Sequence, residues 1–452
     1  MFRLFDKALS DDRIEAIENA ALDAARANDF DRAREELKPL MRAQRHQPEA
    51  ARALIRVAGS YRLPVEAALE ILAEVEAAHS ADTELLSFVA AASEAAREID
   101  FLNAAPPEHA MFLRVADTLS NRLEAVRDTD AEQDLLAGLA TIARIVGRQR
   151  DAIAEHAYLR LIELEPERSS HHYNYGLFLK TRGRFAEGVA TNQQAIQLAK
   201  EPAESYQWNL GICATGAGDG KTALKVWKGI GNKIEMGQFD LPDGGYPQCK
   251  VRLAQRPLAE RDAATDDPGF EETIWIQRLS PCHGIVRSVL VQDLGVDYGD
   301  VVLTDGAPIT YHRYGDDEVP VFPHLATIRR QGYRFYDFAG TQRNEGQLED
   351  LSRGLSADAI IYSHTENYSE ICSTCWNDPD VDHEQHDAET RSIVTGRIAA
   401  PPSIDAKQLL AELDAALAED DDCRLYAPSL AIVAGETERA SVEQRRFDML
   451  SS

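Results

Sequence analysis

A dense run of cysteine, histidine and acidic residues, "SHTENYSEICSTCWNDPDVDHEQHDAE" at 363–389, is the part of the sequence best suited to metal chemistry. Two residues separate the cysteines of one pair, and two residues separate the histidines of a second pair that follows. Thiolate and imidazole are the ligands that zinc prefers, and a Cys-x2-Cys turn directs two sulfurs at one point. We therefore expect zinc, in a structural rather than a catalytic role, with these ligands: Cys372, Cys375, His383 and His386.

Other interpretations of the same run stay open. The gap between the two pairs is shorter than in common zinc motifs, so His364, Cys282 and His283 are alternative ligands. Without a metal, the run would be an acidic surface loop with two buried cysteines and two solvated histidines. Its acidic residues also follow the spacing of an EF-hand calcium loop, but His383 stands where that loop needs a glycine, which favours a solvated loop over calcium.

Two catalytic interpretations of these residues are weak. His364-x-Glu366 ahead of the cysteines is similar to the motif of zinc-dependent nucleobase deaminases, but the five residues between the two halves cannot hold the strand and helix those enzymes need. Cys282 and His283 suggest a thiol with its base, yet adjacent residues in an extended segment point in opposite directions. The sequence favours a structural or ligand role for both.

The segment "GICATGAGDGKTALKVW" at 211–227 has the appearance of a nucleotide-binding loop. A phosphate loop requires Gly-x4-Gly-Lys-Thr between a strand and a helix. Thr215 occupies the position of the first glycine, and the residues before it, "YQWNLGIC", predict a helix. We therefore interpret the segment as the turn of a helical repeat.

A repeat of about 35 residues organises the N-terminal half. From about Ser10 to Gly231 the chain is rich in Ala, Leu, Glu and Arg, and its apolar residues recur at three- and four-residue spacing. The segment that begins at Tyr173 overlays the one that begins at Trp208 with a shift of 35, which aligns Gly176 with Gly211. A period of this length predicts stacked helical hairpins.

This pattern resembles the tetratricopeptide repeat (TPR), in which a first helix, a Gly-Asp turn and a second helix carry fixed large and small residues. The best match has these residues: Trp208, Leu210, Gly211, Gly218, Asp219, Ala223 and Trp227. Second helices at a spacing of 34 are marked by Ala33 and Ala67, and again by Ala154 and Gly188. The resemblance implies an all-α solenoid over residues 1–235, with a degenerate stretch near 80–135 between two pairs of clear repeats.

The resemblance also implies a binding surface, because proteins of this family usually accept a peptide or a partner's helix in the concave groove lined by first helices. We expect Tyr173, Lys180 and Trp208 to face that groove. Asn174 and Asn209 are similar to the paired asparagines with which some family members hold a peptide's terminal carboxylate. No matching lysines accompany them, which favours a structural role for both.

The C-terminal half, residues 236–452, changes character. The segment "GNKIEMGQFDLPDGGYPQ" has the Gly, Pro and Asp content of a linker. Beyond it, β-branched and aromatic segments separated by turn residues predict a small antiparallel sheet or barrel over 248–322. A helix at 323–332 and a strand–helix–strand sequence then predict a β-α-β part over 323–452 that carries the Cys/His loop. We expect an α+β domain with a mostly antiparallel sheet, and we recognise no family for it.

Composition excludes several classes of protein. The 452 residues carry a net charge of −28, and no basic patch stands out that would bind nucleic acid phosphates. The N-terminus lacks the apolar stretch of a signal peptide and nowhere do about 20 apolar residues run together, so we expect a cytoplasmic protein without membrane contact. Six cysteines are too few for a disulfide scaffold.

Two functions fit these features. The repeat favours an adaptor or scaffold that binds a protein or peptide in the concave groove, with a zinc-stabilised C-terminal domain making a second contact. The alternative is a metal-dependent enzyme, a hydrolase or a modifier of proteins or peptides, which recruits its substrate through the repeats. Its support is the Cys/His run together with a strand that ends near Ser363 and His364, since such strand ends often carry sites.

Overall fold

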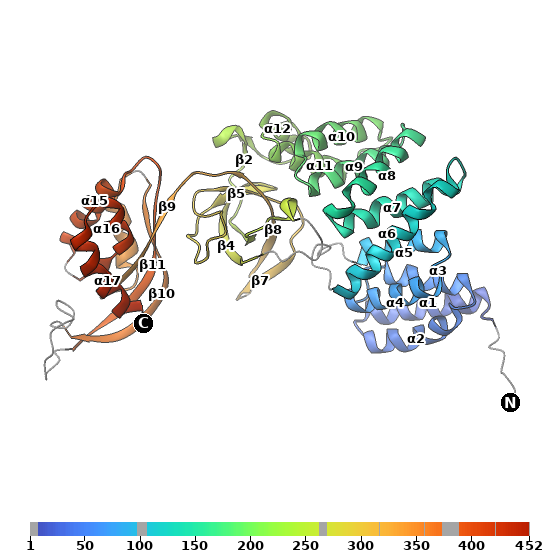
Figure 1. Cartoon of the computed structure of the whole chain (residues 1–452), viewed down its shortest axis with the longest axis horizontal. Coiled ribbons are helices and arrows are strands. Elements are labelled where there is room, and N and C mark those ends of the chain that lie inside the picture. The colour runs from blue at the N-terminus through green and yellow to red at the C-terminus, as the bar shows by residue number, and fades with distance from the viewer. Residues whose placement is uncertain are drawn as a thin grey trace.

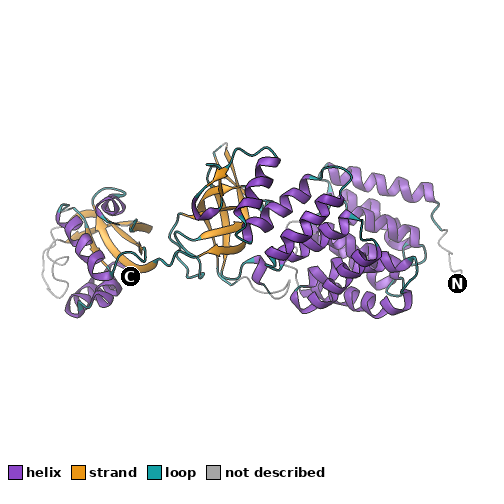
Figure 2. Ribbon diagram, turned by 90° about the horizontal axis from the view of Figure 1, so that it is seen from above, coloured by secondary structure: helices purple, strands orange, loops and turns teal. Residues whose placement is uncertain are grey.

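The computed structural model describes residues 8–96, 106–261, 269–315, 317–356, 358–372, 388–420 and 422–451. A helical solenoid, a β-barrel and an α+β domain follow one another along the long axis of the molecule (Figure 1). Seen from above, helices make up the N-terminal half and strands appear only beyond it (Figure 2). Within the described ranges, no helix combines the length and the apolar character needed to cross a bilayer.

The N-terminal half is a stack of helical hairpins, as the TPR resemblance predicts. Each hairpin packs against the next, and one apolar core extends from Ile14 in the first hairpin to Leu179 in the fifth. The hairpins are α1 (Asp11–Arg26) with α2 (Phe30–Ala43), α3 (Pro48–Ala58) with α4 (Val65–Ala78), α5 (Thr83–Ala96) with α6 (Pro106–Val126), α7 (Ala131–Val146) with α8 (Asp151–Leu164), α9 (Ser169–Thr181) with α10 (Phe185–Leu198), and α11 (Glu204–Gly216) with α12 (Gly220–Gly229). The degenerate stretch therefore forms a further hairpin, α5 and α6, whose second helix is unusually long.

Small residues allow the helices of a hairpin to approach closely. A Cβ atom on Gly211 would lie 2.5 Å from the ring of Trp227, and one on Gly176 would lie 2.5 Å from the side chain of Asn192. Both distances are too short for any neighbour to tolerate without movement. The glycines that mark the repeat in the sequence are therefore required by packing.

The segment with phosphate-loop appearance is the turn between α11 and α12. Gly218 has a φ of +73°, which glycine adopts without strain. The carboxylate of Asp219 then accepts a hydrogen bond from the backbone N–H of Thr222 at 3.1 Å and caps α12. The interpretation as a repeat turn is confirmed.

Beyond α12, a small hairpin leads into a closed barrel. The hairpin strands are β1 (Glu235–Met236) and β2 (Pro242–Asp243), and the barrel strands are β3 (Cys249–Ala254), β4 (Glu271–Ser280), β5 (His283–Val286), β6 (Val301–Thr304) and β8 (Asp317–Arg329). These five pair with their neighbours antiparallel, and β8 returns to pair with β3 in parallel, which closes the ring. One further strand, β7 (Thr310–Tyr314), pairs with the outer part of β8.

The helix predicted over residues 323–332 is wrong, because most of this segment belongs to β8. The backbone of β8 pairs with three strands, β3, β6 and β7, so long-range pairing decides its conformation over the local helical pattern. The β-rich part consequently extends to Arg329 rather than ending at 322.

The last part of the chain is a four-stranded antiparallel sheet with helices. Its strands are β9 (Arg334–Gln342), β10 (Ile360–Cys372), β11 (Ala388–Ala400) and β12 (Arg424–Tyr426), in the spatial order β10-β11-β9-β12. The helices are α13 (Gln347–Asp350), α15 (Ala406–Ala418), α16 (Pro428–Ala434) and α17 (Thr437–Ser451). The two strands of the predicted β-α-β unit are β9 and β10. Both pair antiparallel with β11, which lies between them, so they are parallel to each other but not adjacent.

The solenoid and the barrel share one apolar core. Trp227 and Ile212 of the last hairpin are buried in the same cluster as Leu303 of β6 and Leu325 of β8. The barrel therefore packs directly on the end of the solenoid, and the two must be considered together when a binding surface is sought.

The barrel and the C-terminal sheet meet at a small mixed contact. Arg397 on β11 donates to the carboxylate of Asp297 at 3.0 Å and to the carbonyl of Leu290 at 2.7 Å. Burial raises the pKa of Asp297 to about 6, against the opposing effect of its hydrogen bonds and of Arg397. This contact fixes the position of the C-terminal sheet on the barrel.

Candidate partner-binding site

The first helices of the last two hairpins line a pocket of about 290 Å³. Two walls are the first helices α9 and α11, and the third is the loop of residues 305–307 that joins β6 to β7. The pocket is therefore built by both the solenoid and the barrel. We call it the composite pocket.

Helical spacing explains which side chains of the solenoid reach this pocket. Tyr173, Leu177 and Lys180 lie four and three residues apart on α9 and so share one face. Ser205, Trp208, Asn209 and Ile212 follow the same rule on α11 and complete the helical walls. Four of the five residues predicted to bind a partner are brought together here: Tyr173, Lys180, Trp208 and Asn209.

Aromatic rings form the walls near the open end. The rings of Tyr173 and Tyr206 are stacked with centroids 4.4 Å apart. Trp208 meets Trp227 edge to face at 5.1 Å, and its Nε1 donates to the carboxylate of Glu204 at 3.1 Å. These contacts hold the rings in fixed positions, which lowers the entropy lost when a ligand binds to them.

Lys180 is buried and paired, unlike a lysine whose ammonium group is exposed in a binding groove. Its side chain is 6% exposed, and its Nζ donates to Asp305 at 2.8 Å. The backbone N–H of Gly306 donates to the other oxygen of Asp305 at 2.7 Å, so the loop itself orients this carboxylate. Lys180 thus holds the barrel loop against α9.

The loop also packs on Trp208. A Cβ atom on Gly306 would lie 2.9 Å from the indole ring, so only glycine allows this approach without displacing the tryptophan. Asp305 and Gly306 are functional candidates that sequence reasoning missed. The only signal was "TDGAP" at 304–308, which reads as a turn and gives no hint of its distant contact.

The two predicted asparagines have different environments. Asn209 is 3% exposed, and its Nδ2 donates to Oδ1 of Asn192 at 2.9 Å. Asn192 is fully buried and donates in turn to the carbonyl of Gly188 at 2.7 Å. Asn174 is exposed and does not line the pocket. Asn209 therefore has a structural contact with α10, and the two asparagines do not form a pair.

The residues predicted to bind zinc fall largely outside the described part of the chain. Cys372 is the last residue of β10, whereas Cys375, His383 and His386 lie outside the described residues, as does the acidic segment considered for calcium. Among the residues that are described, no three His, Cys, Asp or Glu side chains converge as metal ligands. Zinc binding by this run stays a prediction.

The three alternative ligands are described, and they have other partners. His364 Nε2 lies 2.8 Å from the carbonyl of Val289, while Cys282 and His283 are buried at the barrel end near Ser280. Burial raises the pKa of the Cys282 thiol to about 11, and burial lowers the pKa of His283 to about 4. Both groups are therefore neutral at pH 7, which suits core packing rather than nucleophilic chemistry.

Cys282 and His283 do not point apart, as an extended segment would require. The hydroxyl of Ser280 lies 3.8 Å from Cys282 Sγ and is hydrogen-bonded to Nδ1 of His283. The pairing of β4 with β5 shifts register between Arg278 and Ser280, and the chain turns at this point, which brings both side chains to one hydroxyl. The expectation of opposite directions is therefore wrong.

Comparisons with known proteins concern the N-terminal half. A structure reported as a functional characterization of Pseudomonas aeruginosa PilF has 16% identity and a TM-score of 0.31, covering 49% of this chain and 91% of that chain. YrrB, described as a TPR protein with an unusual peptide-binding site, has 15% identity and a TM-score of 0.25, covering 42% and 90%. Acl4, described as the assembly chaperone of RpL4, has 14% identity and a TM-score of 0.32, covering 48% and 89%. No family model and no curated protein sequence matches the chain.

Proposed function

We propose that the protein is an adaptor that binds a protein or peptide partner in the composite pocket. The observation that carries this proposal is the construction of the pocket from three separate elements, α9, α11 and the loop of 305–307. The pocket exists only where the solenoid and the barrel meet. Aromatic rings line it, and the ion pair of the buried Lys180 with Asp305 lies beside them. Apolar walls with few polar groups are typical of binding sites.

The dimensions of the pocket favour a short anchor rather than a whole helix. A volume of about 290 Å³ accepts one or two side chains of a partner, and the rest of the partner would lie along the concave surface of the solenoid. Tyr173 and Trp208 offer ring faces to an apolar or cationic side chain. Asp305 belongs to the barrel, so a partner in this pocket would also contact the C-terminal half.

The Cys/His run adds a further element to this proposal. Zinc held by Cys372, Cys375, His383 and His386 would stabilise the loop between β10 and β11 and supply no open coordination position for catalysis. The adaptor function does not require this metal, because no residue that lines the composite pocket belongs to the Cys/His run.

Peptide selection on the full chain tests the proposal. Peptides selected from a random library should bind the unaltered protein and lose at least about tenfold in affinity when the pocket is filled by Ala307→Arg or Ser205→Arg. Both residues are exposed at the rim, so these changes leave the core intact. The control is Gln194→Arg on the exposed face of α10, which should bind as the unaltered protein does. Equal affinity for all variants would exclude the composite pocket as the binding site.

A further inference from the structure

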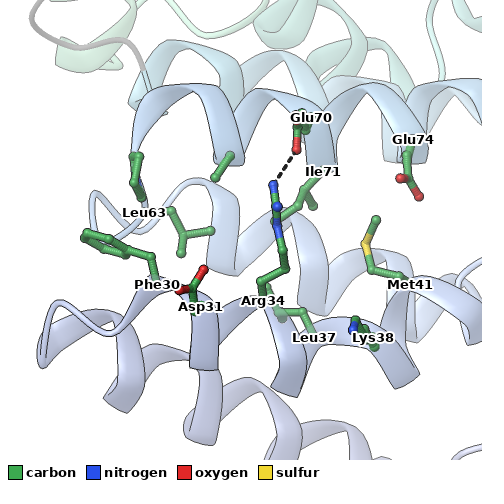
Figure 3. A pocket seen from close by; sticks show the side chains of 12 residues that line it. Phe30, Asp31, Arg34, Leu37, Lys38, Met41, Leu63, Glu70, Ile71 and Glu74 are labelled. Carbon is green, nitrogen blue, oxygen red and sulfur yellow. Dashed lines mark hydrogen bonds and ion pairs between the residues drawn. The ribbon is translucent and has the colours of Figure 1, made fainter.

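A second groove lies at the other end of the solenoid, between the second helices of the first two hairpins. It runs between α2 and α4 and has a volume of about 640 Å³ (Figure 3). The composite pocket is lined by first helices, α9 and α11, whereas this groove is lined by second helices. The two surfaces are therefore distinct, and we call this one the α2/α4 groove.

The floor of the α2/α4 groove is apolar. Leu37 and Ile71 are nearly buried at its base, and Met41 and Leu63 are half-buried beside them. Phe30, 39% exposed, lies at the end where Leu63 is found, and Met41 points into the space between the helices (Figure 3). By contrast, the neighbouring second helices α4 and α6 contact each other directly.

The walls of the groove carry opposite charges. Arg34 and Lys38 are one turn apart on α2, and Glu70 and Glu74 are one turn apart on α4. Asp31 also lines the groove on α2, so this wall has two basic side chains and one acidic one, whereas the α4 wall has two acidic ones. One ion pair crosses the groove, from Arg34 to Glu70 at 2.9 Å, and both of these side chains are about two-thirds exposed. Lys38 is paired with Glu35 of its own helix. Such exposed pairs contribute little to stability, so a ligand can replace them at small cost.

We propose that the α2/α4 groove binds an amphipathic helix of a partner protein, with acidic side chains on one edge of its apolar face and basic side chains on the other. The acidic edge would lie along Arg34 and Lys38, and the basic edge along Glu70 and Glu74. The lining residues of α2 extend from Phe30 to Met41, a length of about three helical turns, which sets the length of the bound segment.

Two physical arguments select this occupant. A groove between two neighbouring helices accepts the side-chain ridge of a third helix, and it offers no strand edge to an extended peptide. Walls of opposite sign favour an occupant with both charges and disfavour one whose two edges have the same charge, because one edge would then face a wall of like sign. Charge therefore supplies specificity here and the apolar floor supplies affinity.

Three synthetic helical peptides with one apolar stripe test this inference on the full chain by fluorescence anisotropy at 0.3 M salt. One has an acidic and a basic edge, one has two acidic edges, and one has two basic edges. The unaltered protein should bind the mixed peptide at least about tenfold more tightly than either of the others.

Charge reversals of one wall should change this preference in a defined way. Arg34→Glu with Lys38→Glu makes both walls acidic and should shift the preference to the peptide with two basic edges. Glu70→Lys with Glu74→Lys should shift it to the peptide with two acidic edges. All four residues are exposed, so these variants retain the fold.

Controls separate this groove from other surfaces. Glu124→Lys with Arg127→Glu reverses an exposed ion pair at the C-terminal end of α6 and should leave the preference unchanged. Ala307→Arg, which fills the composite pocket, should also leave it unchanged, so failure of one proposal is distinguishable from failure of the other. Equal affinity for the three peptides, no binding at millimolar concentration, or a preference that the wall variants do not alter would overturn the inference. Self-association of the unaltered chain that Met41→Glu abolishes would identify a second copy as the occupant and would also overturn it.

Discussion

Lys180 and Asp305 form an ion pair across the boundary between the solenoid and the barrel, with 2.8 Å between Nζ and a carboxylate oxygen. They are 125 positions apart in the sequence. The lysine is almost fully buried and the aspartate is 29% exposed, so the pair is fixed at the base of the composite pocket. A lysine without its partner in this place would be a buried charge with no compensation.

Asp305→Asn should therefore destabilise the protein by about 2 kcal/mol, because it removes the partner of a buried ammonium. A denaturant titration of the full chain measures this loss. The double variant Lys180→Met with Asp305→Asn should be more stable than the sum of the single changes predicts, by at least about 1 kcal/mol. Strict additivity would show that the two residues do not interact.

The buried asparagine pair between α10 and α11 gives a second prediction. Asn192→Leu leaves the Nδ2 of Asn209 without its partner and removes a side-chain hydrogen bond to the carbonyl of Gly188, so we expect a loss of about 2 kcal/mol in the free energy of unfolding. Asn192→Leu with Asn209→Leu should cost less than the two single changes together, since no donor of the pair remains.

The control for this pair is Gln194→Leu on the same helix. Gln194 is exposed, so its replacement should change the stability by no more than about 0.5 kcal/mol. If Asn192→Leu were as mild as this control, the asparagine pair would have no role in holding the last two hairpins together.

A buried histidine predicts how stability depends on pH. His324 on β8 is 2% exposed, and burial lowers its pKa to about 4 in the folded protein. In the unfolded chain the imidazole has a pKa of about 6.5, so the unfolded state takes up the proton first as the pH falls. The stability contributed by the neutral form is complete above pH 6.5 and is lost progressively toward pH 4, by about 3 kcal/mol.

Thermal unfolding of the full chain between pH 7 and pH 4 measures this effect. His324→Gln should make the acid side of the stability curve flatter than in the unaltered protein. His46→Gln, at an exposed position, is the matched control and should leave the slope unchanged. An identical slope for His324→Gln would show that this histidine is not responsible.

The metal content of the purified protein tests the zinc prediction. We expect about one zinc per chain in the full-length protein, measured by mass spectrometry of the metal after exposure to zinc and removal of excess. Cys372→Ser with Cys375→Ser should abolish it, and His46→Gln should not change it. A chain that stays free of zinc after this treatment would exclude the Cys2His2 site.

The solenoid was predictable from sequence because its signal is local and repeated. Gly176 and Gly211 stand at equivalent positions since each is closely approached by a side chain from the second helix of its own hairpin, and that requirement recurs with the repeat. The turn at Gly218 was predictable for the same reason. Helical spacing also placed Tyr173, Lys180 and Trp208 on one surface.

The barrel loop at this surface was not predictable, because its contact depends on a fold that the local pattern does not reveal. Asp305 and Gly306 have the composition of any turn, and the packing of β6 on the last hairpin brings them to Lys180 and Trp208. The helix expected at 323–332 fails for the same reason. When a strand pairs along both edges, its neighbours determine its conformation, and a single sequence does not show which strands these neighbours are.

The last hairpin and the barrel share an apolar cluster. The boundary near residue 235 therefore separates two segments of the sequence that we expect to fold as one cooperative unit. If the two fragments separated after a cut there, the indole of Trp227 and the side chain of Leu303 would lose the cluster in which both are now buried and would be exposed to water. A protease acting on that linker should release neither fragment, and heat should melt both portions in a single transition.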